Sequence, residues 1–258
     1  MQPRGLLLLA LLAVMPACGG GNSSNSTPPG MLSGNWEMNL QKDDSTLKPK
    51  TQSGFLLQQK DVVTGSVILK ATPCSGVGSV NGMVSGSNVA LTVSPTGITV
   101  NLTGTLGSDQ ASMSGDYIIL PQGCSGSQTA PEMGTWTANL VKPLGGSFTG
   151  TFTSVKVGDL PVNGQVTQAA NTGSSAPLGG KLTVAGYCFS ATNISGAISG
   201  TDVVMNLLNS DGSQAGEVTG TSSLDGKSIS GKYFAVPQGV GGNPPCVSGD
   251  SGTVTLSF

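Results

Sequence analysis

The sequence predicts an all-β protein made of two tandem, antiparallel β domains, and three observations lead to this prediction. Apolar residues alternate with small polar residues over short runs, which is the pattern of strands with one buried face. Gly, Asn and Ser separate these runs at short intervals, as turn residues do. Finally, residues 113–124, MSGDYIILPQGC, return as residues 229–240, ISGKYFAVPQGV, at an offset of 116 residues (229 − 113). A pattern repeated at one offset indicates an internal duplication.

The composition of the 258-residue chain disfavours several classes of function. Charged residues make up 9% of the chain, the net charge is −2, and there is no run of basic residues. We therefore expect no nucleic-acid binding, which relies on Lys and Arg contacts to phosphates. The chain contains no His, the commonest general base and metal ligand. These features predict a non-catalytic protein with no metal ion and no other cofactor.

The N-terminus has the features of a targeting segment, and we expect residues 1–17 to be a signal peptide. Arg4 precedes an apolar run, residues 6–14, that is too short to span a bilayer. Residues 15–18, Met-Pro-Ala-Cys, then resemble the lipobox of bacterial lipoproteins, in which the Cys receives a lipid. The Ala and the Cys fit that motif, and the Pro departs from it.

The lipobox resemblance implies that Cys18 is lipidated, which makes the membrane a partner and places the protein in the bacterial cell envelope. Residues 18–32, rich in Gly and polar residues, are then a flexible tether. In this family a residue other than Asp after the Cys implies the outer membrane, and here that residue is Gly19. The alternative is a secreted, soluble protein in which Cys18 is a free thiol.

Four further cysteines, an even number, predict disulfides in an oxidising compartment. Four cysteines allow three pairings. Cys74 and Cys188 are equivalent residues 114 positions apart (188 − 74), while Cys124 and Cys246 both follow the repeated Pro-Gln-Gly. The duplication therefore favours one bridge per copy, Cys74–Cys124 and Cys188–Cys246, each worth roughly 4 kcal/mol by chain entropy. A metal site is disfavoured because no Cys-x-x-Cys spacing is present.

The first copy, assigned to residues 33–142, contains eight candidate strands joined mostly by short turns. Their expected ranges are about 34–40, 53–60, 63–70, 78–84, 88–94, 97–105, 112–119 and 134–141. The second copy, assigned to residues 143–258, contains eight more. Their expected ranges are about 146–154, 161–169, 179–186, 192–198, 202–208, 215–221, 228–236 and 252–258. The offset between the copies rises steadily from 112 to 118, so the whole domain is repeated.

Eight short strands in an open sheet leave two unpaired edges, and closure into a barrel removes both. We therefore predict an eight-stranded up-and-down barrel for each domain, with a β-sandwich of two four-stranded sheets as the alternative. Gly34-Asn35-Trp36 in the first strand resembles the Gly-x-Trp motif of calycin-type barrels, the lipocalins and the avidin–streptavidin group. That resemblance implies a barrel in which the Trp ring packs at one end.

Trp36 and Trp136 are the candidate pocket residues. They fall in the first and last strands of one copy, which are neighbours in a closed barrel. They would line a ligand pocket there or simply fill the barrel end, whereas the second copy has Phe148 and Val254 at these places.

Other polar residues are better explained by structure than by chemistry. Asp116 and Lys232 occupy equivalent places, each before a Tyr, so a shared catalytic charge is disfavoured and both are expected to face solvent. Asp44, Asp211 and Asp225 lie in Gly- and Ser-rich segments that suit turns better than calcium sites.

The leading functional hypothesis is therefore a lipid-anchored, non-catalytic protein outside the cytoplasm that binds a small apolar ligand or a surface protein. A structural or adhesive surface module is the second hypothesis. The third is an enzyme with a carboxylate-based site, which requires convergent acidic residues such as Glu37 with Asp61 or Asp116.

Overall fold

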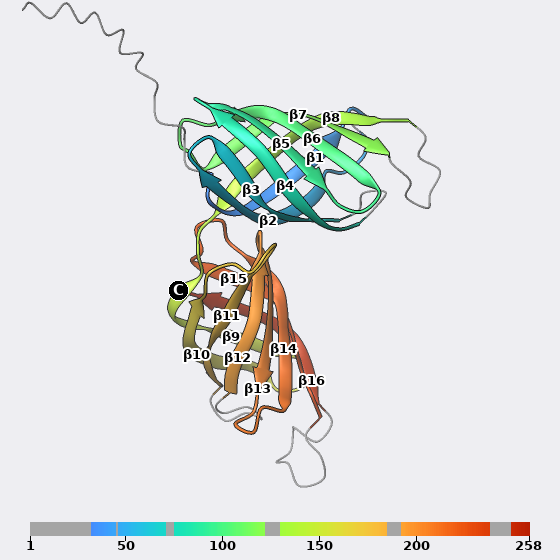
Figure 1. Ribbon diagram of the computed structural model, residues 1–258. Coiled ribbons are helices and arrows are strands. Elements are labelled where there is room, and N and C mark those ends of the chain that lie inside the picture. The colour runs from blue at the N-terminus through green and yellow to red at the C-terminus, as the bar shows by residue number, and fades with distance from the viewer. Residues whose placement is uncertain (1–31, 45, 71–74, 122–129, 185–191, 238–248) are drawn as a thin grey trace, which may run out of the picture.

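The computed structural model describes residues 32–44, 46–70, 75–121, 130–184, 192–237 and 249–258. It confirms the all-β prediction, because the chain forms two closed barrels of eight antiparallel strands each (Figure 1). Each barrel is an up-and-down meander in sequence order, so the β-sandwich alternative is wrong. Among the described residues, no helix is long and apolar enough to span a bilayer.

All eight strands expected in the first copy are present. They are β1 (Gly34–Lys42), β2 (Lys50–Gln59), β3 (Val62–Leu69), β4 (Gly76–Ser85), β5 (Asn88–Ser94), β6 (Ile98–Leu106), β7 (Ser112–Pro121) and β8 (Glu132–Val141). The pairing of β1 with β8 closes the barrel. Strand β2 begins three residues earlier than predicted, because polar residues that resemble a loop extend the ladder up to the pair of Leu40 with Lys50.

The second barrel repeats this topology with the remaining eight strands. They are β9 (Gly145–Ser154), β10 (Gly158–Gln168), β11 (Ala176–Val184), β12 (Thr192–Ser199), β13 (Asp202–Leu208), β14 (Gln214–Ser222), β15 (Ser228–Ala235) and β16 (Asp250–Ser257). Strand β16 pairs with β9 and closes the barrel. The architecture thus confirms the internal duplication.

The same arrangement seals one end of each barrel, where the chain enters its first strand. Leu32 and Leu144 are at most 1% exposed and belong to the apolar cores of the first and second barrels. Their backbone N–H groups donate to side-chain oxygens at matching places, Leu32 to Gln58 at 2.8 Å and Leu144 to Gln168 at 2.9 Å. The backbone N–H of each buried Leu therefore has a hydrogen-bond partner, so its burial leaves this donor satisfied.

The second barrel packs end-on against the outer wall of the first, which lies across it in Figure 1. The contact involves β1 and β2 on one side and β12 on the other. Phe55 points outward from β2, yet it is only 7% exposed and belongs to the apolar core cluster of the second barrel. One barrel therefore supplies a side chain that covers the core of the other.

Candidate functional site

The two Trp side chains lie inside the first barrel on neighbouring strands, with Trp136 paired opposite Leu40. Both rings are at most 1% exposed. Trp36 Nε1 donates to the Leu32 carbonyl at 2.8 Å, and Trp136 Nε1 donates to the Thr103 carbonyl at 3.1 Å. The rings are thus packed and hydrogen-bonded parts of the interior. An apolar-ligand pocket beside them stays a prediction, and the grooves described below lie elsewhere.

A tyrosine–carboxylate pair is buried at the end of the first barrel opposite Leu32. Tyr117 Oη donates to Glu132 Oε1 at 2.9 Å, and Lys50 Nζ donates to both Glu132 oxygens at 3.0 and 3.1 Å. Burial raises the pKa of Glu132, but the hydrogen bonds from Lys50 and Tyr117 outweigh it, and the pKa lies below its usual value. Burial, followed by the bond to Glu132, raises the pKa of Tyr117. Glu132 is therefore ionised and Tyr117 neutral at pH 7.

The second barrel repeats the pair, since Tyr233 Oη donates to Asp250 Oδ2 and both side chains are buried. Burial, with this bond second, raises the pKa of Tyr233. Neither carboxylate was predicted from the sequence. Glu132 and Asp250 are the first residues of the last strand in their barrels, 118 residues apart (250 − 132). Because 118 is also the offset between the last strands of the two copies, the sequence could have identified these carboxylates as equivalent residues. Their recurrence in the same structural place favours a structural role.

The repeated Tyr residues are buried and the charges that precede them face solvent, as the sequence predicts for the charges. Tyr117 and Tyr233 are 3% and 2% exposed, whereas Asp116 and Lys232 are exposed on the outer walls. Strand alternation places each charge on the face opposite its Tyr.

The structure does not bring together the acidic residues that the enzyme hypothesis requires. Glu37 lies at the junction between the barrels, where it accepts a hydrogen bond from the Thr201 hydroxyl. Asp61 lies in the turn between β2 and β3, and Asp116 lies on the outer wall of β7.

The three acidic residues considered above as calcium ligands stabilise their own turns instead. The carboxylates of Asp44, Asp211 and Asp225 accept hydrogen bonds from hydroxyl and backbone groups within four residues, and these bonds lower the pKa of each. Within the described ranges, no group of three or more acidic or Cys side chains could hold a metal ion.

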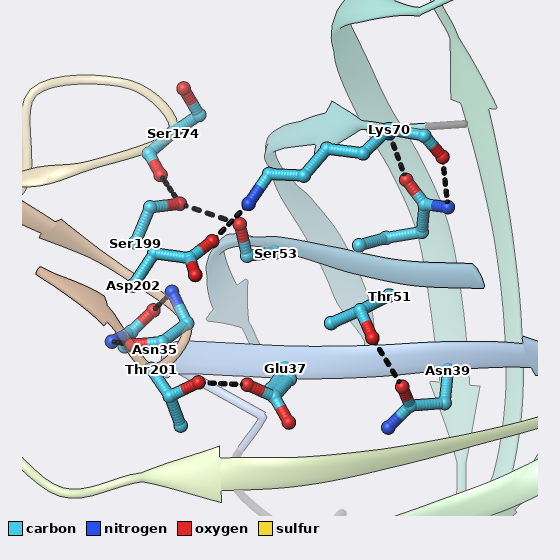
Figure 2. Close-up of polar contacts among 12 residues, drawn as sticks. Asn35, Glu37, Asn39, Thr51, Ser53, Lys70, Ser174, Ser199, Thr201 and Asp202 are labelled. Atoms are coloured by element: carbon cyan, nitrogen blue, oxygen red, sulfur yellow. Dashed lines mark hydrogen bonds and ion pairs between the residues drawn. The ribbon is translucent and has the colours of Figure 1, made fainter. Parts of the chain in front are cut away.

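A seam of polar contacts joins the barrels, and Figure 2 shows it. Asn35 Nδ2 donates to the Gly200 carbonyl at 2.8 Å, while Gly200 N–H donates to Asn35 Oδ1 at 2.7 Å, and both bonds are buried. Beside them, Ser199 Oγ lies 3.0 Å from Ser53 Oγ. Because the Asn35 amide and the Gly200 backbone are hydrogen-bonded to each other in a buried place, the seam favours one orientation of the two barrels.

At the edge of this seam, a groove of about 620 Å³ runs along the outer wall of the second barrel. Strands β13, β14 and β15 form the wall, and Lys70, which directly follows β3, contributes from the first barrel. The Lys70 ammonium forms an ion pair with Asp202 across the junction (Figure 2). The groove is thus made by both barrels, and we call it the junction groove.

The floor of the junction groove is a pair of glycines, Gly220 and Gly231, which lie directly opposite each other on β14 and β15. A Cβ atom at Gly231 would lie 2.2 Å from the Thr219 carbonyl oxygen, so the close approach of the strands excludes a side chain. The outward side chains around this floor are those of Val204, Thr219, Thr221, Ser230 and Lys232.

The first barrel has a groove of about 540 Å³ at the equivalent place. Its lining residues are equivalent in the duplication to those of the junction groove. Asn88, Val89 and Ala90 correspond to Asp202, Val203 and Val204 at an offset of 114 residues. Thr103 and Gly104 correspond to Thr219 and Gly220 at an offset of 116 residues. Its glycine, Gly104, is also paired directly with a glycine, Gly115, on the next strand. The groove was therefore duplicated with the fold.

The two grooves differ in chemistry. Apolar surface dominates both linings and includes Met83 in the first groove, whose wall continues to the acidic Asp116. The junction groove has Lys232 at that place and gains Lys70 from the other barrel. It can therefore offer the Lys232 ammonium group to a ligand, whereas the polar side chains that line the first groove, Ser85, Asn88 and Thr103, are all uncharged.

The remaining predicted site residues, Cys18, Cys74, Cys124, Cys188 and Cys246, lie outside the described residues. Comparison of the chain with protein-family models, with curated proteins and with solved structures found no match.

Proposed function

We propose that this chain is a non-catalytic binding protein of the bacterial cell envelope. A lipid on Cys18 holds it at the outer membrane, and it engages a surface partner through the junction groove. The observation that carries the proposal is the composition of that groove, since Lys70 comes from one barrel and the wall from the other. Clefts between domains are common binding sites. The buried seam beside the groove supports a fixed arrangement of its two sides.

A surface partner suits this geometry better than an apolar ligand inside a barrel. Trp36 and Trp136 are packed and hydrogen-bonded, so a ligand beside them has to displace buried side chains. The junction groove needs no such displacement because the side chains of Val204, Thr219 and Lys232 in its lining already face outward.

Lysine acylation tests the proposal without knowledge of the partner. The rate of Lys232 acylation is measured in intact cell envelopes and in the purified, detergent-solubilised protein. We expect Lys232 to react more slowly in envelopes, because a bound partner covers it. Lys181, exposed on the outer wall of β11, is the matched control and should react equally in both. Equal Lys232 rates in both samples would contradict the proposal.

The anchor has its own test. Cells that produce the chain are grown with an alkyne-labelled fatty acid, and the chain is examined for label. The wild-type chain should carry the label and sediment with membranes, since a lipid chain drives membrane binding. Cys18→Ser should carry none, and label retained in that variant would place the lipid elsewhere.

We also propose the disulfides Cys74–Cys124 and Cys188–Cys246. In the first barrel, β3 and β7 finish at the same end of the meander, and Cys74 and Cys124 follow these two strands in the sequence. In the second barrel, β11 and β15 likewise finish at one end, and Cys188 and Cys246 follow them in the sequence. Peptide mapping under non-reducing conditions should give these two pairs, whereas a Cys74–Cys188 peptide would refute them.

A further inference from the structure

The junction groove carries an excess of positive charge. Lys70 and Asp202 neutralise each other as an ion pair in which both side chains are about half exposed, at 44% and 48%. Lys232 is exposed on β15 and forms no ion pair within the described part of the chain. The equivalent residue of the first barrel is Asp116. Of the two duplicated grooves, the junction groove alone is suited to an anionic ligand.

Hydroxyl groups surround this charge. Thr219, Thr221 and Ser230 are exposed around the glycine floor, and each hydroxyl can both donate and accept a hydrogen bond. The lining contains no aromatic ring on which an apolar ligand could stack. The lining surface is mainly apolar, but its polar side chains are hydroxyls and charged groups, which can recognise a ligand rich in hydroxyls with an acidic group.

The strand pairing argues against an extended peptide as the ligand. Peptides that join a β-sheet bind along an unpaired strand edge. Strand β14 pairs with β13 on one side and β15 on the other, and the barrel is closed. The backbone of the groove wall is therefore occupied, so a ligand has to be recognised through side chains.

We propose that the junction groove binds an acidic saccharide, a sugar chain that carries carboxylate groups. Lys232 pairs with a carboxylate, and the hydroxyls of Thr219, Thr221 and Ser230 bond the sugar hydroxyls. The Lys70–Asp202 pair closes the side of the groove formed by the first barrel. This inference rests on the proposed function, because it names the ligand class of the same groove.

Calorimetric titration of the purified, lipidated full chain in detergent tests the inference. The probes are a short galacturonic acid oligomer, a neutral glucose oligomer of the same length and an oligoglutamate peptide of the same charge. We expect the galacturonate to bind and the other two to bind at least about tenfold more weakly. Its affinity should fall as salt increases, because ions screen an exposed charge.

Lys232→Asp is the decisive variant, since it introduces the residue that the first barrel tolerates at the equivalent place. It should weaken galacturonate binding by about tenfold or more, because an attraction becomes a repulsion. The control Lys181→Ala should keep the affinity within about twofold, since Lys181 lies on the outer wall of β11, outside the junction groove. Absent galacturonate binding, an equal affinity for oligoglutamate, or an unchanged affinity of Lys232→Asp would each overturn the ligand class. If the ligand class is overturned but Lys232 is protected from acylation in envelopes, the proposed function stands. If the ligand class is overturned and Lys232 is not protected, the ligand class and the proposed function are both wrong.

Discussion

Asn35 and Gly200, 165 residues apart in the sequence, exchange two buried hydrogen bonds of 2.8 and 2.7 Å across the junction of the barrels. The amide side chain of Asn35 pairs with both polar groups of the Gly200 backbone. Asn35 of the first barrel thus provides hydrogen-bond partners for the backbone N–H and C=O of a turn residue in the second barrel. Removal of either partner leaves buried polar groups without a bond, which is costly.

Asn35→Ala should loosen the junction and lower its stability by about 1–3 kcal/mol, because the N–H and C=O of Gly200 lose their partners. Small-angle scattering should show a wider range of inter-barrel orientations. The control is Asn39→Ala on the same strand, where the side chain bonds the exposed Thr51 hydroxyl. An unchanged scattering profile for Asn35→Ala would show that other contacts set the orientation.

Gly200→Ala should destabilise the chain more than Gly86→Ala. The two glycines occupy equivalent turns with similar positive φ angles, +56° and +59°, so both variants carry the same backbone strain of about 1–2 kcal/mol. A Cβ at Gly200 also lies 2.7 Å from the Cβ of Ser53, whereas one at Gly86 has open space. Chemical denaturation should therefore separate the two variants by about 1 kcal/mol or more. Equal losses would mean that the barrels do not touch there in solution.

Phe55→Ala should destabilise the second barrel although Phe55 belongs to a strand of the first. Its ring lies in the core cluster of the second barrel, so truncation should cost about 3 kcal/mol there. Hydrogen exchange should speed up in β10 to β15. Trp fluorescence reports the first barrel, where both Trp side chains lie, and should change little.

The control for Phe55→Ala is Leu57→Ala, two residues along the same outer face and 49% exposed. It should cost less than about 0.5 kcal/mol. Faster exchange in the first barrel alone would show that Phe55 stabilises its own barrel and not the other.

Glu132→Gln should remove part of the acid sensitivity of the first barrel. The pKa of Glu132 is lowered in the folded state, so its stabilisation is present above the unfolded pKa of about 4.3 and is lost as pH falls through the folded value. The variant should be less stable than wild type at pH 7 by about 1–3 kcal/mol, and this difference should shrink in acid. Trp fluorescence during denaturation at pH 7 and pH 3 measures it.

Asp116→Asn is the matched control for Glu132→Gln, because Asp116 is exposed on the outer wall of β7. Its stability should follow wild type at both pH values. A difference between wild type and Glu132→Gln that stayed constant with pH would contradict the ionised Tyr117–Glu132–Lys50 arrangement.

The strands, their order and their closure could be predicted from the sequence because local patterns determine them. Alternation of apolar and polar residues marks each strand, and glycine-rich turns separate them. The duplication then supplied the domain count, and the edges of an eight-stranded sheet required closure. The same offsets relate Glu132 to Asp250 and one groove to the other, so part of the polar arrangement was also present in the sequence.

The junction and its groove were decided only by the tertiary structure. Ser53 and Phe55 alternate outward on β2 like residues that face solvent, and no periodicity distinguishes a wall exposed to water from one covered by another domain. Lys70 and Asp202 are distant in sequence and meet only because one barrel packs end-on against the other. The sequence by itself thus determined two closed barrels, since strand pattern and edge closure are properties of each copy. Their packing against each other created the candidate binding site, since it depends on surfaces that come together only after each barrel has formed.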